Sequence, residues 1–278
     1  MQRRFVLVIV LAGLVTATSG RAQQTQESAV SKPLAKDIGF AKMPEWSIDV
    51  PDLSDVEVKD LLATLERLLA QESDAAKWTS SASIPFWRFQ ARLERGRMTR
   101  VQEATVATYF DALAAIHPAD RAYIERRKWA ALNIGIGRTA PDITGKDFDG
   151  ATFSLNDYRG KVVYLVFTGE WCAPCRSEYP YQRLMLELYK DKPFALLGVN
   201  SDAKLETARQ GKVDSNLPNR SWWDGHEKES TKGPIAATWG VTAWPTIYIL
   251  DATGAIRFAD LRHEDSLKAV AQLMAEKP

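Results

Sequence analysis

Apolar side chains along residues 52–133 recur at steps of three and four residues, the spacing of one buried face of an α-helix. Gly96 and His117-Pro118 interrupt this pattern, whereas Pro85 and Thr99 stand where a new helix can begin. The pattern therefore predicts four helices, over about residues 52–69, 83–96, 99–116 and 119–132.

The pattern changes at Gly137 to short apolar runs separated by glycine, proline and aspartate. Two runs, Val162–Phe167 and Phe194–Val199, flank a segment with helical spacing, which predicts parallel strands joined by a right-handed crossover. A hairpin is predicted over residues 147–155, with Asp149-Gly150 in its turn. Further strands or short extended pieces are predicted at residues 221–223, 245–250 and 255–258, and helices at residues 175–188, 204–210, 234–239 and 265–275.

The predicted fold class is α/β, with a central mixed sheet flanked by helices and a small all-helical region before it. We place the helical region at residues 46–135 and the sheet domain at residues 136–278. Pro180 removes a backbone donor inside the helix predicted over residues 175–188, so it should bend that helix near Arg176. We expect the aromatic side chains of the helical region to fill its core: Trp78, Phe86, Trp87 and Phe89.

The first 45 residues lack the regular pattern of the rest of the chain. Arg3-Arg4 precedes an apolar stretch, Phe5–Val15, and Gly20-Arg21-Ala22 offers the small residues that a signal peptidase reads. We predict an export signal over residues 1–22 and a linker over residues 23–45, hence an exported, periplasmic location. The alternative is an uncleaved N-terminal anchor that tethers the protein to the membrane.

Composition narrows the classes of partner. Apolar residues make up 45% of the chain and charged residues 26%, which is typical of a globular protein, and the formal net charge is +1. Such a small net charge provides no field to attract a polyanion, so we expect no nucleic-acid partner. The chain has only 2 cysteines, so an exported protein of this sequence has no disulfide framework.

Both cysteines lie in one motif, Cys172-Ala173-Pro174-Cys175, which follows the apolar strand and opens the next predicted helix. The C-x-x-C spacing after a buried strand is typical of a thioredoxin-like redox site. A thiolate at Cys172 would be stabilised by the free N–H groups of the helix start, so we predict that Cys172 attacks the substrate. Cys175, one turn further and more buried, would resolve the mixed disulfide.

Other uses of two cysteines fit less well. A zinc site needs about four ligands, and His117, His226 and His263 are scattered without ligand spacing, so we expect no metal. Covalent haem attachment requires a histidine directly after the second cysteine, where this chain has Arg176. No cofactor is therefore expected. An inert structural disulfide remains an alternative, although so short a loop would stabilise the fold little.

Several separated motifs resemble the TlpA/ResA-like thiol-disulfide oxidoreductases of the thioredoxin superfamily. These are Trp-Cys-Ala-Pro-Cys after the strand, Glu-Tyr-Pro beyond it, Gly-Val-Asn-Ser-Asp at the end of the next strand, and Trp-Pro-Thr before Ile-Tyr-Ile-Leu-Asp. The likeness covers about residues 137–278 and implies a thioredoxin-like fold. It does not extend to the helical region.

The resemblance also implies roles for individual residues. Pro245 is expected to be a cis-proline beside the cysteines, and Trp171, Trp244, Pro245 and Thr246 are expected to contact the substrate. Glu178 lies three residues after Cys175, on the same helix face, and in this family a glutamate at that position accepts a proton. The alternative for Glu178 is an exposed, solvated side chain. We expect Glu170 to be a charge on the exposed rim.

The sequence thus predicts an exported enzyme that exchanges disulfides with protein thiols or disulfides. Ala173-Pro174 and the family likeness favour a reductase, kept reduced by a membrane electron donor, and reduction of cytochrome c apoproteins is one task by analogy. One alternative is a thiol peroxidase of peroxiredoxin type, but Gly169 stands where such an enzyme has Thr or Ser. The other is a non-enzymatic binding protein built on a thioredoxin-like scaffold.

Overall fold

The computed structural model describes residue 48 and residues 52–60, 62–63, 97–116, 118–225, 233–241 and 243–276. The predicted export signal, the linker and the helix expected over residues 83–96 lie outside these residues, and so do the four aromatic side chains of that region. Within the described ranges, none of the helices combines the length and apolar character needed to cross a membrane.

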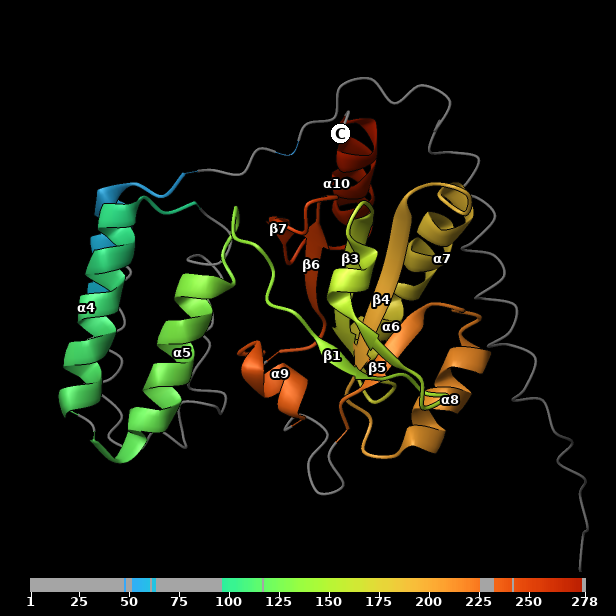
Figure 1. The fold of residues 1–278 in the computed structure, drawn as a ribbon, viewed down its shortest axis with the longest axis horizontal. Helices are drawn as coiled ribbons and strands as arrows, with labels where there is room; N and C mark the ends of the chain where they lie inside the picture. The colour runs from blue at the N-terminus through green and yellow to red at the C-terminus, as the bar shows by residue number, and fades with distance from the viewer. Residues whose placement is uncertain are drawn as a thin grey trace, which may run out of the picture. The chain divides into compact units, whose positions relative to one another are not determined.

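A sheet of five strands forms the centre of the C-terminal part (Figure 1). Its strands, in spatial order, are β5 (Arg220–Trp223), β4 (Phe194–Asn200), β3 (Val162–Thr168), β6 (Thr246–Leu250) and β7 (Ile256–Ala259). β3 runs parallel to β4 and β4 parallel to β5, whereas β6 is antiparallel to both of its neighbours. The predicted mixed sheet of a thioredoxin-like fold is confirmed.

The other elements agree closely with the sequence pattern. The hairpin pairs β1 (Thr144–Lys146) with β2 (Thr152–Ser154), and Gly150 has the positive φ of 88° that its turn requires. The helices are α4 (Arg100–Ile116), η4 (Pro118–Asp120), α5 (Arg121–Asn133), η5 (Leu155–Tyr158), α6 (Ala173–Ser177), α7 (Tyr179–Leu188), α8 (Leu205–Asp214), α9 (Pro234–Thr238) and α10 (His263–Ala275).

The helix predicted over residues 175–188 is instead two helices. α6 ends and α7 begins at Glu178, which caps both. Pro180 stands in the first turn of α7, where its missing N–H costs no hydrogen bond, so the chain breaks two residues later than the bend we predicted near Arg176. The break matters for function because it places Glu178 at the junction beside the cysteine motif.

One face of the sheet is almost entirely apolar. Since strand side chains alternate, Val163, Leu165 and Phe167 of β3 point to this face together with the residues paired to them on β4 and β6. Trp222 and Trp239 join the same cluster, and both are buried. This layer is the main hydrophobic core of the sheet domain.

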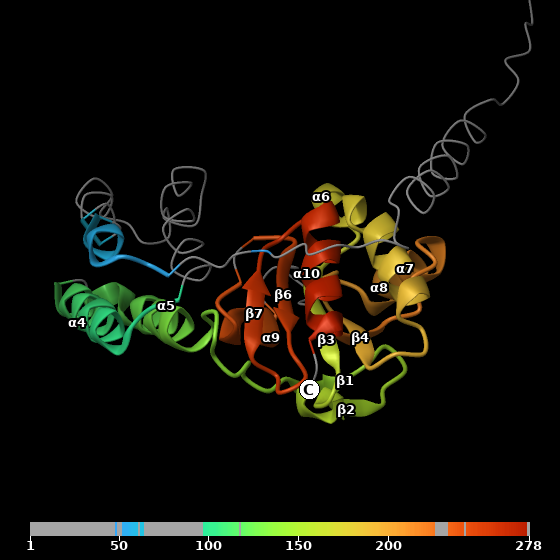
Figure 2. The same cartoon turned by 90° about the horizontal axis from the view of Figure 1, so that it is seen from above.

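The opposite face is covered by α7 and α10 (Figure 2) and carries buried polar groups. Tyr164 of β3 lies near Gln182 of α7 and Ser266 of α10, and the side chains of all three are buried. Tyr164 Oη, Thr168 Oγ1, Glu178 Oε1 and Gln182 Nε2 are buried without a hydrogen-bond partner of good geometry. The candidate site is built at the end of this polar face.

The helices before the sheet domain form a cluster of their own. Val106 and Phe110 of α4 pack with Ile124 and Ala131 of α5. Ala130 of α5 and Ile134, the residue directly after this helix, also belong to the cluster on the apolar face of the sheet, so α5 contributes to both cores. The boundary that we placed between residues 135 and 136 remains a prediction.

Candidate active site

The cysteine motif directly follows the central strand. β3 ends at Thr168, and four residues later Cys172 is the N-cap of α6, with φ −92° and ψ 99°. Cys172 is disulfide-bonded to Cys175, and the Cα atoms lie 5.2 Å apart. Pro174 stands in the first turn of α6, as its lack of an N–H predicts.

Burial does not distinguish the two cysteines, because Cys172 is 2% exposed and Cys175 is 1% exposed. We expected Cys175 to be the more buried of the two, and the difference is only slight. The hydrogen bonding does distinguish them, since the Cys175 N–H donates to Cys172 Sγ at 3.2 Å. A donor aimed at this sulfur favours its thiolate over its thiol. The geometry is therefore consistent with Cys172 as the attacking sulfur.

The second half of the site precedes β6. The Trp244-Pro245 peptide bond is cis, as the family likeness implies. Phe167 pairs with Thr246, so Pro245 lies next to the end of β3, from which the cysteine motif continues. Thr246 is 8% exposed and its hydroxyl donates to the Ala243 carbonyl at 2.8 Å, so little of its side chain is available to a substrate.

Two indole rings from the two halves meet at the surface. The Trp171 and Trp244 ring centroids are 5.7 Å apart with their planes at 56°. Trp171 is 47% exposed, an unusual position for so large an apolar side chain. The pair gives a substrate an aromatic surface next to the disulfide, and its role in binding remains a prediction.

Glu178 is buried rather than solvated, with 1% of its side chain exposed. Its Oε2 accepts a hydrogen bond from the His263 backbone N–H at 3.0 Å, and its Oε1 lies 3.5 Å from His263 Nε2. The exposed, solvated alternative for Glu178 is therefore wrong. His263 was not singled out by the sequence, because nothing in the pattern relates the start of the last helix to the cysteine motif.

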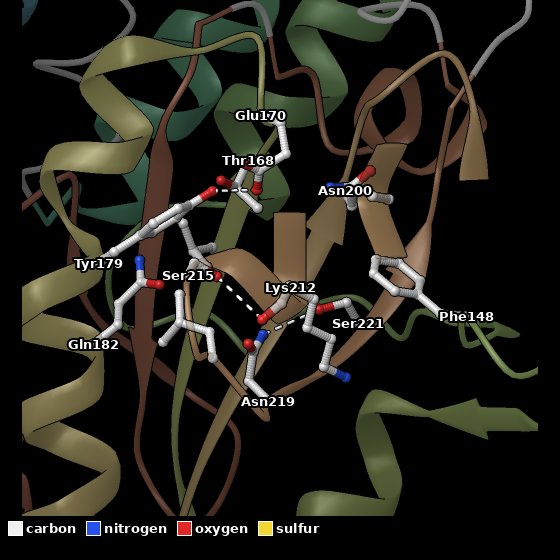
Figure 3. A pocket seen from close by; sticks show the side chains of 13 residues that line it. Phe148, Thr168, Glu170, Tyr179, Gln182, Asn200, Lys212, Ser215, Asn219 and Ser221 are labelled. Atoms are coloured by element: carbon white, nitrogen blue, oxygen red, sulfur yellow. Dashed lines mark hydrogen bonds between the residues drawn. The ribbon is translucent and has the colours of Figure 1, made fainter. Parts of the chain in front are cut away.

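Glu170 is not the exposed rim charge that we expected. It is half-buried, and its Oε1 accepts a hydrogen bond from Tyr179 Oη at 2.6 Å (Figure 3). Burial raises the pKa of Glu170, and the nearby Asp202 carboxylate raises it further, against the lowering effect of the Tyr179 bond. Gly211 of α8 allows this position, because a Cβ there would overlap the Glu170 carboxylate.

Glu170 and Tyr179 line a cavity of about 30 Å³ between α7, α8 and the sheet (Figure 3). Thr168 and Gln182, which carry buried unpaired polar atoms, also line it. A space of this size and polarity can hold a water molecule.

The loop after β4 ties both halves of the site together. Asp202 accepts the Glu170 backbone N–H at 2.9 and 3.2 Å, and Asn200 orients its carboxylate through a 2.8 Å hydrogen bond. Ser201 donates its backbone N–H to the Thr168 carbonyl and accepts the Trp244 indole N–H at 2.9 Å. The sequence showed this Asn-Ser-Asp segment as a family motif but gave it no role.

In the described part of the chain, no group of three or more His, Cys, Asp or Glu side chains lies close enough together to hold a metal ion. Arg262 places a positive charge near the cis-proline. Its guanidinium donates a hydrogen bond to the Pro245 carbonyl and lies 3.4 Å from the Asp260 carboxylate.

The site combines a C-x-x-C disulfide at a helix start with a cis-proline that directly precedes an internal strand of a mixed sheet. This combination defines a thiol-disulfide oxidoreductase of the thioredoxin class. Sequence comparison agrees. Residues 136–259 match the AhpC/TSA family. The thiol-disulfide oxidoreductase ResA of Geobacillus thermodenitrificans is 30% identical over 125 residues, 45% of this chain and 68% of that protein.

The thioredoxin-like protein YneN of Bacillus subtilis is 33% identical over 131 residues, 46% of this chain and 74% of that protein. Among solved structures, the thioredoxin domain of a thiol-disulfide oxidoreductase from Bacteroides vulgatus is 29% identical with a TM-score of 0.46, covering 50% of this chain and 98% of that one. The chain belongs to the TlpA/ResA-like family of thiol-disulfide oxidoreductases.

Proposed function

We propose that this enzyme is exported and reduces disulfide bonds in protein substrates through the Cys172–Cys175 pair. Cys172 attacks the substrate disulfide and Cys175 resolves the mixed disulfide. The substrate is released in its reduced form, and the enzyme then carries the Cys172–Cys175 disulfide. A membrane electron donor then returns it to the dithiol form. The periplasm is the proposed location.

The observation that carries this proposal is the backbone hydrogen bond from Cys175 N–H to Cys172 Sγ. It supplies a fixed donor to one sulfur of the pair, and the sulfur so favoured as a thiolate is the nucleophile. Exposed Trp171 beside Trp244 supports a protein substrate, because an aromatic surface suits an extended peptide better than a small polar molecule.

Substrate trapping tests the proposal directly. The Cys175→Ser variant should accumulate a mixed disulfide with a disulfide-bonded model protein, visible as a higher-mass band on non-reducing gels. The Cys172→Ser variant is the matched control and should form none. Reduction of the model protein by the wild-type enzyme, coupled to dithiothreitol, should proceed at a rate that both variants lose.

Three results would contradict the proposal. Equal trapping by both variants would remove the assignment of Cys172. Rapid consumption of hydrogen peroxide without disulfide reduction would favour the peroxidase. Absence of any exchange in the wild type would favour a binding protein.

A further inference from the structure

The proton-accepting role predicted for Glu178 raises the question of how its proton reaches solvent. The carboxylate is 1% exposed and lies at the junction of α6 and α7, under α10. A carboxylate without direct access to water needs a second group that reaches both it and the solvent.

His263 meets that requirement by position. Its ring Nε2 lies 3.5 Å from Glu178 Oε1, which makes no closer hydrogen bond, and 3.4 Å from the exposed Ser177 hydroxyl. The His263 side chain is 46% exposed. The ring therefore stands between the buried carboxylate oxygen and water.

The other oxygen of Glu178 is held separately. Oε2 accepts the His263 backbone N–H at 3.0 Å, so the main chain fixes the carboxylate while the ring faces the free oxygen. His263 holds this arrangement with a φ of 51°, in the left-handed region that non-glycine residues seldom adopt. Backbone strain of this kind is often retained at functional positions.

The remaining groups around Glu178 are unsuited to accept its proton near neutral pH. Burial, followed by the negative charge of Glu178, raises the pKa of Tyr164 on β3. Burial, with Glu264 and Glu178, raises the pKa of Tyr181 on α7. Arg262 is a fixed positive charge. The His263 imidazole is a common general acid and base in proteins, and its Nε2 faces the Glu178 carboxylate.

We propose that His263 carries the proton between Glu178 and solvent during each disulfide exchange. The inference rests on the proposed function and adds to it a relay residue on α10. The contact that supports it joins an exposed imidazole to the one unpaired oxygen of a buried carboxylate.

The relay fits a balanced reaction. The Cys172 thiolate forms a bond to one substrate sulfur, the substrate disulfide breaks, and its other sulfur leaves as a thiolate that takes a proton from water. The Cys175 thiol then gives its proton to Glu178, and its thiolate displaces the second substrate thiolate from Cys172 Sγ. Two electrons have passed from the dithiol to the substrate. Glu178 finally transfers its proton to neutral His263, which releases it to water.

The His263→Asn variant distinguishes the role of the imidazole ring from that of the His263 backbone N–H. Asparagine tolerates a positive φ and keeps the N–H that holds Glu178 Oε2, but it has no titrating ring. Tyr181→Phe is the matched control. The Tyr181 ring contacts His263 with its centroid 5.1 Å away, and its phenol is not part of the relay.

The experiment measures the rate at which the reduced enzyme is oxidised by a disulfide-bonded peptide, followed by tryptophan fluorescence, from pH 5.5 to 9. His263→Asn should be about tenfold slower near pH 7 and lose the pH dependence due to imidazole. Added imidazole should restore the rate. In the Glu178→Gln background neither His263→Asn nor imidazole should have a further effect. Tyr181→Phe should match the wild type.

A His263→Asn profile that superimposes on the wild-type profile overturns the relay. So does a slow variant that imidazole fails to restore, or an effect of His263→Asn that is undiminished in Glu178→Gln. Failure of the proposed function is a different result, because the wild-type enzyme itself would then show no oxidation by the disulfide-bonded peptide at any pH.

Discussion

The two faces of the central sheet differ in what their buried residues do. On one face Val163, Leu165 and Phe167 enter a layer of apolar side chains, whereas on the other Tyr164 and Thr168 meet carboxylates, amides and hydroxyls. All five residues alternate along a single strand. We infer from this difference that the apolar face provides stability, whereas the other face holds partly unsatisfied polar groups beside the cysteines.

The largest expected effect is on the apolar face. Leu165→Ala removes a fully buried side chain and should lower the free energy of unfolding by about 2–5 kcal/mol. Exchange activity per folded molecule should stay near that of the wild type. Urea unfolding and a rate measurement on the folded fraction check both. A large loss of exchange activity at unchanged stability would contradict the proposal that the apolar face serves stability rather than exchange.

The opposite result is expected for Glu178→Gln on the polar face. Loss of a proton acceptor should slow exchange about 100-fold near neutral pH. The side chain keeps an oxygen to accept the His263 N–H, so the urea midpoint should change little. Stopped-flow oxidation of the reduced enzyme provides the rate. An unchanged rate would remove Glu178 from the mechanism.

Ser201→Ala should have a moderate effect at the junction of the two halves. It deletes the acceptor of the Trp244 indole N–H and should cost about 1 kcal/mol of stability. A weaker hold on Trp244 should also raise the KM for a disulfide-bonded peptide more than it lowers kcat. Equal KM values in variant and wild type would show that this hydrogen bond serves the fold alone.

The smallest effect is expected for Glu170→Gln, and it depends on pH. Burial raises the pKa of Glu170 in the folded state, so its contribution to stability is present at low pH and is lost as the pH rises through the folded pKa. Glutamine does not titrate and can still accept the Tyr179 hydroxyl. The variant should therefore gain stability relative to the wild type between pH 4 and pH 7, measured by thermal unfolding. The opposite trend would mean that the ionised Glu170 is stabilised.

Local pattern was sufficient to predict the elements that carry the cysteines. Three features can be recognised from residues adjacent in the sequence: the apolar run of β3, the C-x-x-C spacing and the proline before β6. Each was found where expected. The break at Glu178 was misplaced because Pro180 fits a helix start as well as a bend. Sequence alone could not decide between those two uses of proline.

Long-range contacts were missed for a different reason. Glu170 packs against Gly211 of α8, where a side chain would overlap it, and Glu178 contacts His263, which lies 85 residues later in the chain. Such contacts depend on how helices pack over the sheet, which spacing along the chain does not encode. Glu170 was consequently expected at the exposed rim, and the contact of His263 with Glu178 was not foreseen.

The reduction potential of the Cys172–Cys175 pair tests the central claim most directly. Titration with dithiothreitol or glutathione can be followed by tryptophan fluorescence, because Trp171 adjoins the pair. A reversible two-electron transition near the thioredoxin value of about −270 mV is the predicted result for a reductase. A value of about −120 mV would contradict the reductase direction and make the enzyme a disulfide donor. The absence of a reversible transition would contradict the redox function altogether.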